Sequence, residues 1–241
     1  RQMCIRDRIK TVRISKKAGK WYAAFSCIVE DGVPLAATNR EIGIDVGLAR
    51  LITTSESEKV QPPRFYRRAQ RQLRIAQRRV ARRKKGSKNR RKAVAILQRQ
   101  HEHVANQRKD FLNKLAHDLT TRYDRIALED LRITNMVRNP HLAKSILDAG
   151  WGYLVQRLTY KAASAGRVVV LVDPRYTSKT CSQCGHIFES LSLADRWIDC
   201  ACGLSLDRDH NAAINILKRA GRVRWASSSS IEGFAQEAVG L

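Results

Sequence analysis

The first forty residues alternate apolar and polar side chains with the period of two that is typical of β-strands. Residues 11–15 alternate strictly, and residues 21–29 are rich in aromatic and β-branched side chains. The Lys-Lys-Ala-Gly-Lys sequence at residues 16–20 lies between them and predicts a hairpin turn. Asp31-Gly32 indicates a further turn.

Short apolar runs further along the chain predict strands, the first two of them buried. Residues 42–47 read Ile-Gly-Ile-Asp-Val-Gly, and residues 51–52 continue into a second strand. Residues 125–129 form another short apolar run, and residues 168–172 are five consecutive apolar β-formers. Together these runs predict a central sheet.

Between the second and third of these regions the apolar period changes to that of a helix. Leu73, Ala76 and Val80 recur at helical spacing, and Gly86-Ser87 interrupts the pattern. A second helical pattern follows, with apolar residues at steps of three, four or seven: Val94, Leu97, Val104, Phe111, Leu115 and Leu119. The pattern predicts two long helices joined as a hairpin.

Two more helices are expected near the C-terminus. Residues 145–165 have a helical pattern that ends at Gly166. Residues 207–220 have another, with Asp207 as the predicted N-cap and Gly221 as the predicted stop. Residues 227–230 and those that follow indicate a loose tail.

The charge of the chain points to a polyanionic partner. Its 241 residues include 46 Lys and Arg against 22 Asp and Glu, for a net charge of +24 and a pI near 10.5. Residues 64–92 hold fifteen Lys and Arg and no acid. DNA or RNA phosphates would neutralise this charge, and we expect Arg78, Arg79, Arg82 and Arg83 to hold phosphates without reading sequence. A membrane partner is not expected, because no run of about 18 apolar residues is present.

Four of the six cysteines lie close together in the sequence and predict a metal site. Cys181 and Cys184 are separated by two residues, and Cys200 and Cys202 by one. Four thiolates suit tetrahedral Zn²⁺ and leave no open position, so the predicted zinc is structural. His186 or Asp199 in place of one sulfur is a variant of the same hypothesis.

Three carboxylates stand at positions where a catalytic cation site could form. Asp45 lies inside a predicted buried strand, Glu129 ends another, and Asp209 lies in the first turn of the predicted C-terminal helix. Such a set could bind two Mg²⁺ or Mn²⁺ ions for phosphodiester hydrolysis. Each acid also has a structural reading: Asp45 as a turn residue, Glu129 as a strand-end charge, and Asp209 as a favourable helix-start charge. Spacing alone does not show that they converge.

Four motifs in this order carry a family resemblance. They are Glu41-Ile-Gly-Ile-Asp45-Val-Gly, Ala127-Leu-Glu129-Asp-Leu, Tyr176-Thr-Ser-Lys-Thr-Cys181-Ser-Gln-Cys184-Gly and Asp207-Arg-Asp209-His-Asn-Ala-Ala. With them the chain resembles the TnpB/OrfB family of transposon-encoded RNA-guided DNA nucleases, relatives of the type V CRISPR effectors. The resemblance covers almost the whole chain, and the one-residue gap between Cys200 and Cys202 departs from the usual zinc-ribbon pattern.

The resemblance implies an α/β fold with a ribonuclease H-like (RuvC) core, a basic helical-hairpin insertion and an inserted zinc ribbon. Asp45, Glu129 and Asp209 match the family's catalytic acids. The implied divisions are residues 1–40 as the end of a β-barrel wedge domain, 41–175 as the nuclease core with its insertion at 64–122, 176–206 as the zinc ribbon, 207–221 as the final core helix, and 222–241 as a tail. The rest of the wedge domain and its recognition insert are expected outside this sequence.

The implied function is Mg²⁺- or Mn²⁺-dependent hydrolysis of DNA, directed by a guide RNA, in the prokaryotic cytoplasm near the nucleoid. The expected partners are DNA and guide RNA, and the oligomeric state is left open. One alternative is a catalytically silent, truncated zinc protein that binds nucleic acid or regulates transposition. Another is a strand-transfer integrase or junction resolvase on the same fold, against which the cysteine segment argues.

Overall fold

The computed structural model describes residues 8–28, 33–191 and 195–222 and is built around a five-stranded mixed sheet. The sheet order is β5-β4-β3-β6-β7. Strands β3, β6 and β7 run parallel, whereas β4 runs antiparallel to both of its neighbours. The bounds are β3 (Glu41–Val46), β4 (Ile52–Thr54), β5 (Lys59–Val60), β6 (Arg125–Glu129) and β7 (Val168–Val172). The predicted strands are therefore confirmed within a mixed α/β fold, and β3, β4 and β6 are the buried ones, whereas the edge strand β7 leaves Val168 and Leu171 exposed.

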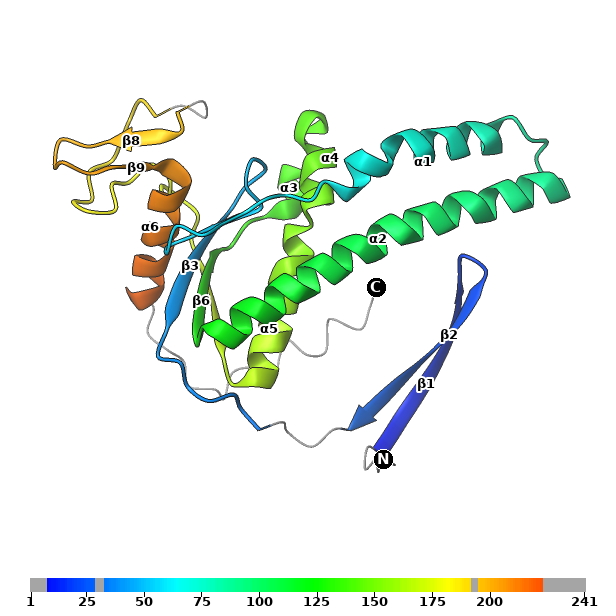
Figure 1. The fold of residues 1–241 in the computed structure, drawn as a ribbon, viewed down its shortest axis with the longest axis horizontal. Coiled ribbons are helices and arrows are strands. Elements are labelled where there is room, and N and C mark those ends of the chain that lie inside the picture. Colours follow the sequence, from blue (N-terminus) through cyan, green and yellow to red (C-terminus); the bar gives the residue numbers. More distant parts are fainter. Residues whose placement is uncertain (1–7, 29–32, 192–194, 223–241) are drawn as a thin grey trace.

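One face of this sheet packs against α2 (Lys88–Arg122) and α5 (Trp151–Ala165). Ile42 and Ile44 of β3 and Leu128 of β6 are fully buried in this main core. Figure 1 shows α2 and α5 on this side of β3 and β6. The aliphatic runs of the two strands thus form the larger apolar layer of the molecule.

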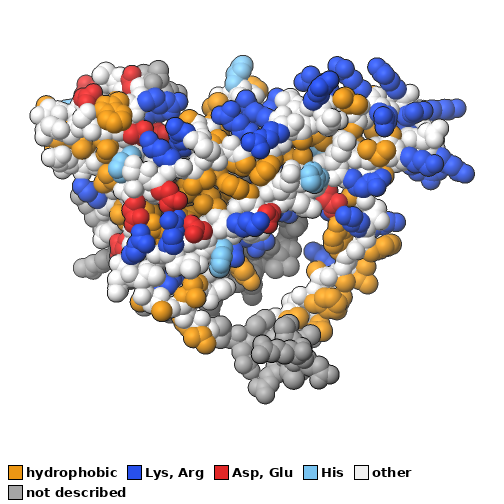
Figure 2. Space-filling view, in the orientation of Figure 1, with side chains coloured by type: hydrophobic (Ala, Val, Ile, Leu, Met, Phe, Trp, Pro, Cys, Tyr) orange, Lys and Arg blue, Asp and Glu red, His pale blue; other side chains and the backbone are white. Residues whose placement is uncertain are grey.

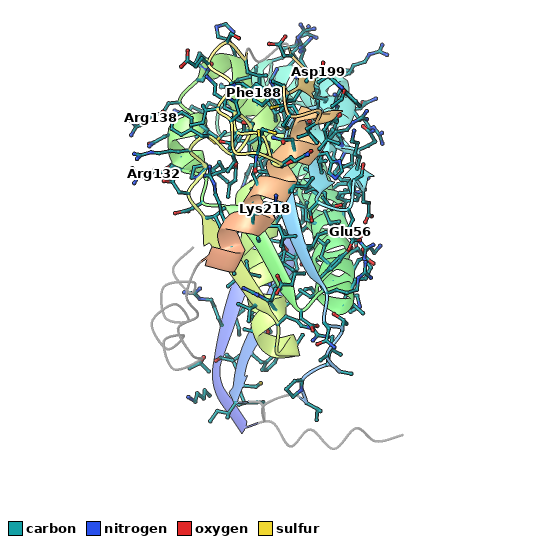
Figure 3. All side chains as sticks on the ribbon, turned by 90° about the vertical axis from the view of Figure 1, so that its left-hand side faces the viewer. Glu56, Arg132, Arg138, Phe188, Asp199 and Lys218 are labelled. Atoms are coloured by element: carbon teal, nitrogen blue, oxygen red, sulfur yellow. The ribbon has the colours of Figure 1, made fainter. Side chains whose placement is uncertain are left out.

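The opposite face of the sheet is covered by α6 (Arg208–Arg222). Ala127 and Val172 of the sheet pack there with Ile216 and Ala220 of the helix. Gly43 permits the close crossing, because a Cβ at that position would lie 2.1 Å from the Ala213 carbonyl oxygen. Figure 3 shows α6 crossing this face of the sheet, with Lys218 on the helix.

The basic segment forms the predicted pair of long helices. α1 (Phe65–Ala81) packs against α2, and Leu73 and Ala76 are buried between them. Ser87 caps α2 by accepting a hydrogen bond from the Arg90 amide. The pair extends well beyond the sheet (Figure 1), so much of its charged surface faces solvent.

The N-terminal segment forms the predicted β-hairpin, with β1 (Arg8–Lys17) paired to β2 (Lys20–Ile28). Its turn is Ala18-Gly19, within the predicted residues 16–20. Tyr22 donates a hydrogen bond to the Glu102 carboxylate of α2 at 2.9 Å. The hairpin therefore contacts α2 through this hydrogen bond.

Two helix predictions are corrected. Residues 145–165 are not one helix: α4 (Pro140–Ala149) follows the short α3 (Ile133–Met136), and the chain breaks at Gly150 before α5. Gly150 has φ 72°, a left-handed conformation that ends α4 and redirects the chain. Gly166, with φ 68°, ends α5 as predicted, but α6 continues through Gly221 to Arg222.

Some predictions lie outside the described residues: the turn at Asp31-Gly32, the tail from residue 223 onward, and Cys4. Within the described ranges, no helix has both the length and the apolar character that crossing a membrane requires.

Candidate active site and metal centre

Asp45 and Glu129 lie on the same face of the sheet, at the carboxyl ends of adjacent parallel strands. Ile44 is in register with Leu128, so the next residue of each strand is an acid. Since Ile44 and Leu128 point into the core against α2 and α5, alternation turns Asp45 and Glu129 toward α6. Both carboxylates are half-buried.

The third acid, Asp209, lies on α6. Asp207 precedes the helix and caps it, accepting hydrogen bonds from the amides of Asp209 at 3.0 Å and His210 at 3.2 Å. The predicted cap is therefore confirmed, and Lys59 pairs with the other oxygen of Asp207 at 2.8 Å. Asp209 itself lies in the first turn, on the helix that covers the Asp45 face.

The charges of these acids interact. Burial raises the pKa of Asp45 well above its usual range, and the neighbouring Glu129 and Asp209 carboxylates raise it further. Arg208 opposes this rise only in part. The three acids thus lie near enough for their charges to interact, and a divalent cation would offset their mutual repulsion. Among the described residues, the four cysteines are the one group of three or more ligand side chains already close enough to share a metal ion.

Glu129 is held by a hydroxyl group. Burial raises its pKa, while a hydrogen bond from Thr177 and the nearby Arg219 guanidinium act in the opposite direction. Thr177 Oγ1 donates to Glu129 Oε1 and is itself almost fully buried. A carboxylate ligand fixed in this way keeps its second oxygen available for a cation.

The four cysteines of the sequence prediction form one cluster. Their sulfur atoms all lie within 4.8 Å of one another. The Cys181 and Cys202 sulfurs are 3.7 Å apart, and those of Cys184 and Cys200 are 3.6 Å apart. Ligands about 2.3 Å from a tetrahedral Zn²⁺ would be about 3.8 Å apart, so the cluster has the right size to bind a metal ion of this kind.

Backbone geometry favours a thiolate at Cys181. Burial raises the pKa of Cys181, but the amide N–H groups of Cys184 and Gln183 and the neighbouring thiols of Cys184 and Cys200 outweigh it and bring that pKa to about 7. Backbone amides lower the pKa values of Cys200 and Cys202, but burial and hydrogen bonds within the same cluster outweigh them and raise both pKa values. Gly185, with φ 82°, makes the turn that returns the chain, and its amide donates to the Cys181 carbonyl at 3.0 Å. The short Cys200–Cys202 loop uses Gly203, with φ 90°, between β8 (Trp197–Asp199) and β9 (Ser205–Asp207).

The alternative ligands His186 and Asp199 have other contacts. The His186 ring packs edge-on against Phe188, with centroids 5.4 Å apart. Asp199 accepts a hydrogen bond from Ser205 Oγ at 2.5 Å. Figure 3 places Phe188 and Asp199 in the cysteine-bearing segment beside the N-terminal end of α6. The described residues therefore favour the four-cysteine set.

The four arginines singled out from the sequence line one surface groove. Arg78, Arg79, Arg82 and Arg83 surround it with Ile75, at the outer end of α1. In the described part of the chain none of these guanidinium groups pairs with a carboxylate. Figure 2 shows Lys and Arg gathered over the outer ends of α1 and α2. An unpaired basic groove of this kind can accept phosphates.

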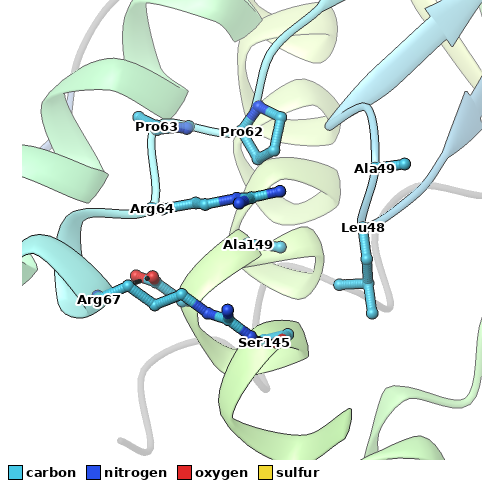
Figure 4. Close-up of a pocket in the computed structure, with 9 residues that line it drawn as sticks. Leu48, Ala49, Pro62, Pro63, Arg64, Arg67, Ser145 and Ala149 are labelled. Carbon is cyan, nitrogen blue, oxygen red and sulfur yellow. Dashed lines mark hydrogen bonds between the residues drawn. The ribbon is translucent and has the colours of Figure 1, made fainter.

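A further cavity of about 220 Å³ lies at the start of α1 (Figure 4). Arg67 donates there to Ser145 Oγ at 2.8 Å. Asp148 is buried and accepts hydrogen bonds from the Tyr66 and Arg67 amides, which caps α1. None of the three clustered acids lines this cavity, so it is separate from the candidate active site.

Sequence reasoning did not single out Thr177, Asn211 or Asn215, although the first two lie within the quoted motifs. All three are buried beside the acids and the cysteines. The available signal was the spacing of Asn211 and Asn215, which are four residues apart on the same stripe of an apolar helix face.

Two family models match the chain. The IS605 OrfB family, described as "Probable transposase", matches residues 24–140. The Cas12f1-like TNB domain family matches residues 151–216, which include all four clustered cysteines.

Curated relatives match over most of the chain. A "Putative RNA-guided DNA endonuclease" of Streptomyces pristinaespiralis is 41% identical over 210 residues, covering 86% of this chain and 52% of the relative. The Escherichia coli protein "Putative RNA-guided DNA endonuclease InsQ" is 32% identical, covering 87% of this chain and 56% of the relative. The chain therefore spans about half the length of these relatives.

Solved structures share the fold. A Cas12f ternary complex matches with a TM-score of 0.56 and 21% identity over 86% of this chain and 44% of the other. Cas12f1 in complex with guide RNA and target DNA matches with a TM-score of 0.54 and 15% identity, over 86% of this chain and 55% of the other.

Proposed function

Since the chain belongs to the TnpB/OrfB family, we propose that it is the nuclease part of an RNA-guided DNA endonuclease of a transposable element. Asp45, Glu129 and Asp209 are its catalytic acids, and Mg²⁺ or Mn²⁺ is their cofactor. Cys181, Cys184, Cys200 and Cys202 hold a structural Zn²⁺. DNA and a guide RNA are its partners.

The topology supports a ribonuclease H-like core. A sheet of order β5-β4-β3-β6-β7 with only β4 reversed is the arrangement we expect of that fold. In an open parallel sheet, functional groups gather where strands end. Here the carboxyl ends of β3 and β6 carry Asp45 and Glu129, and α6 adds Asp209.

The observation that carries the proposal is the electrostatic strain at Asp45. Burial raises the pKa of Asp45, the nearby Glu129 and Asp209 carboxylates raise it further, and Arg208 does not compensate fully. If these acids had only a structural role, replacing one of them would relieve the charge repulsion and stabilise the fold. Oxygen-rich, anionic ligand sets suit Mg²⁺ and Mn²⁺.

The residues have separate roles in phosphodiester hydrolysis. Asp45 and Glu129 provide ligand oxygens from the rigid sheet, and Asp209 provides one from α6. When bound, the divalent ions lower the pKa of the attacking water and stabilise the leaving oxygen. The basic groove of α1 holds phosphates away from the acids, and therefore binding and hydrolysis depend on different residues.

A cleavage assay tests this division. Asp45→Ala, Glu129→Ala and Asp209→Ala are each expected to lower DNA cleavage by roughly 10³-fold or more, because each leaves an incomplete ligand set. DNA binding is expected to stay nearly unchanged. Because the relatives are about twice as long, the assay uses the full-length protein with its guide RNA.

Asp207→Asn is the matched control, since Asn caps a helix about as well as Asp and leaves the three acids in place. It should retain cleavage. Robust cleavage by Asp45→Ala, or equal cleavage in Mg²⁺ and in EDTA, would falsify the three-acid proposal. Binding without cleavage by the wild type would favour the silent zinc protein.

A further inference from the structure

Two asparagines on one face of α6 form hydrogen bonds with the segment that joins β7 to the first cysteine pair. Asn215 Nδ2 donates to the carbonyl oxygens of Thr177 at 2.9 Å and Thr180 at 2.6 Å. Asn211 Nδ2 donates to the same Thr180 oxygen at 2.8 Å. The Asn211 side-chain oxygen accepts the Ser182 amide at 2.8 Å, directly after Cys181.

The same segment holds the candidate active-site acid. Thr177 Oγ1 donates to Glu129 Oε1, and the Pro174 carbonyl lies 3.0 Å from that hydroxyl. A carboxylate is the stronger acceptor for its single proton. Thr177 thus contacts Glu129 with its side chain and Asn215 with its backbone.

This network is closed to solvent. The exposed fractions are 0% for Asn211, 7% for Asn215, 1% for Thr177 and 7% for Ser182. Two buried asparagines in a helix interior are costly unless their amides are hydrogen-bonded, and here both are. Their bonds fix the backbone from Thr177 to Ser182 in one arrangement.

We infer that Asn211 and Asn215 link the cysteine cluster to Glu129, with Thr177 as the positioning residue. This inference rests on the carboxylate site proposed above. A metal ion held by the four cysteines would fix Cys181 and therefore Ser182. Asn211 and Asn215 pass that constraint to Thr177. Thr177 then holds Glu129 in the orientation that binds a catalytic cation.

The expected size of the effect follows from metal sites in general. Loss of a hydrogen-bonding partner of a ligand costs about 10- to 100-fold in metal affinity. Metal on the cysteines and Mn²⁺ on the carboxylates should therefore bind cooperatively, and the coupling should pass through Thr177. Thr177 touches no reacting atom in this scheme, so its effect appears first in cation affinity.

Mn²⁺ titration of the chain, followed by electron paramagnetic resonance, measures this affinity without cleavage. Thr177→Val keeps the shape and removes the hydroxyl, and it should weaken Mn²⁺ binding by about 10-fold or more. Thr177→Ser should restore the affinity. Thr180→Val is the matched control, because among the described residues the Thr180 hydroxyl donates to the Tyr176 carbonyl and not to Glu129. It keeps the Thr180 carbonyl that Asn211 and Asn215 bind, so it should leave the affinity unchanged.

Zinc removal completes the cycle. Stripping zinc with phenanthroline, followed by desalting, should weaken Mn²⁺ binding to the wild type by a factor similar to that of Thr177→Val. The same treatment should change the affinity of Thr177→Val little, because its link is already broken. Mn²⁺ prefers oxygen ligands, so the emptied cysteines do not replace the carboxylate site.

The possible results distinguish failure of the Thr177 link from failure of the carboxylate site on which the link depends. Mn²⁺ binding by Asp45→Ala equal to that of the wild type would remove the carboxylate site itself. A wild type that depends on Asp45 but not on Thr177, or effects of zinc removal and Thr177→Val that simply add, would overturn the link. Should Thr177→Val not fold, zinc removal from the wild type decides: unchanged Mn²⁺ affinity overturns the inference.

Discussion

Asp124, directly before β6, forms hydrogen bonds with the segment that precedes β3. Its carboxylate accepts hydrogen bonds from the Thr38 amide and hydroxyl and from the Asn39 amide, at 2.7 to 3.0 Å. Arg167, which is almost fully buried, pairs with it at 2.5 Å. Burial raises the pKa of Asp124, but these donors outweigh it and the pKa is lowered. The carboxylate therefore contributes stability in its charged form.

Asp124→Asn is expected to lower the free energy of unfolding at pH 7 by about 2 kcal/mol, because it leaves Arg167 without its charge partner. The pKa is lower in the folded state, so this contribution is present above the unfolded value of about 4 and is lost as the pH falls through the folded value. Denaturant unfolding from pH 7 to 3 should show the variant and the wild type converging in acid. The exposed pair Asp118–Arg122 gives the control: Asp118→Asn should change little. A constant difference down to pH 3 would contradict this role.

At the scale of residues, Asp45 could be identified from the sequence because a carboxylate is costly in a buried strand, and the cysteines because of their paired spacing. Their partners could not. Thr177 becomes a ligand-positioning candidate only when β7 and α6 are packed together, and an asparagine in a helix gives no indication of which carbonyl it will meet. Arg208 lies one residue from Asp209, yet its effect on Asp45 depends on the distance between α6 and β3.

At the scale of elements, α1 is expected to carry the salt dependence of nucleic-acid binding. Replacing Arg78, Arg79, Arg82 and Arg83 with Gln removes four positive charges from the groove and should reduce the slope of log K against log salt by about 3 to 4. Sequence preference should change little, because phosphates carry no base identity. Lys114→Gln is the control, since Lys114 pairs with Asp110 on α2. An unchanged slope in the fourfold variant would mean that α1 is only a solvated charged helix.

The cysteine-bearing segment should depend on metal for its fold. Zinc analysis of the purified chain is expected to give one ion per molecule. Cys184→Ala should lose that ion and make the segment sensitive to proteases, because zinc supplies about 10–16 kcal/mol of apparent binding energy in small zinc-finger peptides. Cys27→Ala on β2 removes a thiol far from the cluster and should keep the ion. A folded, protease-resistant segment without zinc would contradict the proposal.

Element predictions succeeded where one period ran between clear breaks, as in α1 and α2 on either side of Gly86-Ser87. They failed where the apolar pattern continued across a break. The apolar pattern of residues 145–165 does not show that Gly150 adopts φ 72°, where a Cβ would lie 3.0 Å from the Leu112 side chain of α2. Gly221 does not adopt a left-handed φ, and therefore α6 continues through it.

At the scale of the molecule, the candidate active site exists only because of chain topology. The parallel pairing of β3 with β6 spans the whole helical pair, and α6 is the last described element to join the sheet. Sequence periodicity predicted β3, β6, the two long helices and α6 but not this closure, which only the family resemblance implied. Three layers then place the acids between the sheet and α6, with the basic helices and the cysteine cluster on different sides (Figure 1).

The central claim is that Asp45, Glu129 and Asp209 form one cation site. Anomalous X-ray scattering from crystals of the chain soaked in Mn²⁺ tests it directly. The account predicts manganese peaks between these three carboxylates in the wild type and none there in Asp45→Ala. Wild-type crystals with manganese only at other surface acids, or with a peak that persists unchanged in Asp45→Ala, would contradict it.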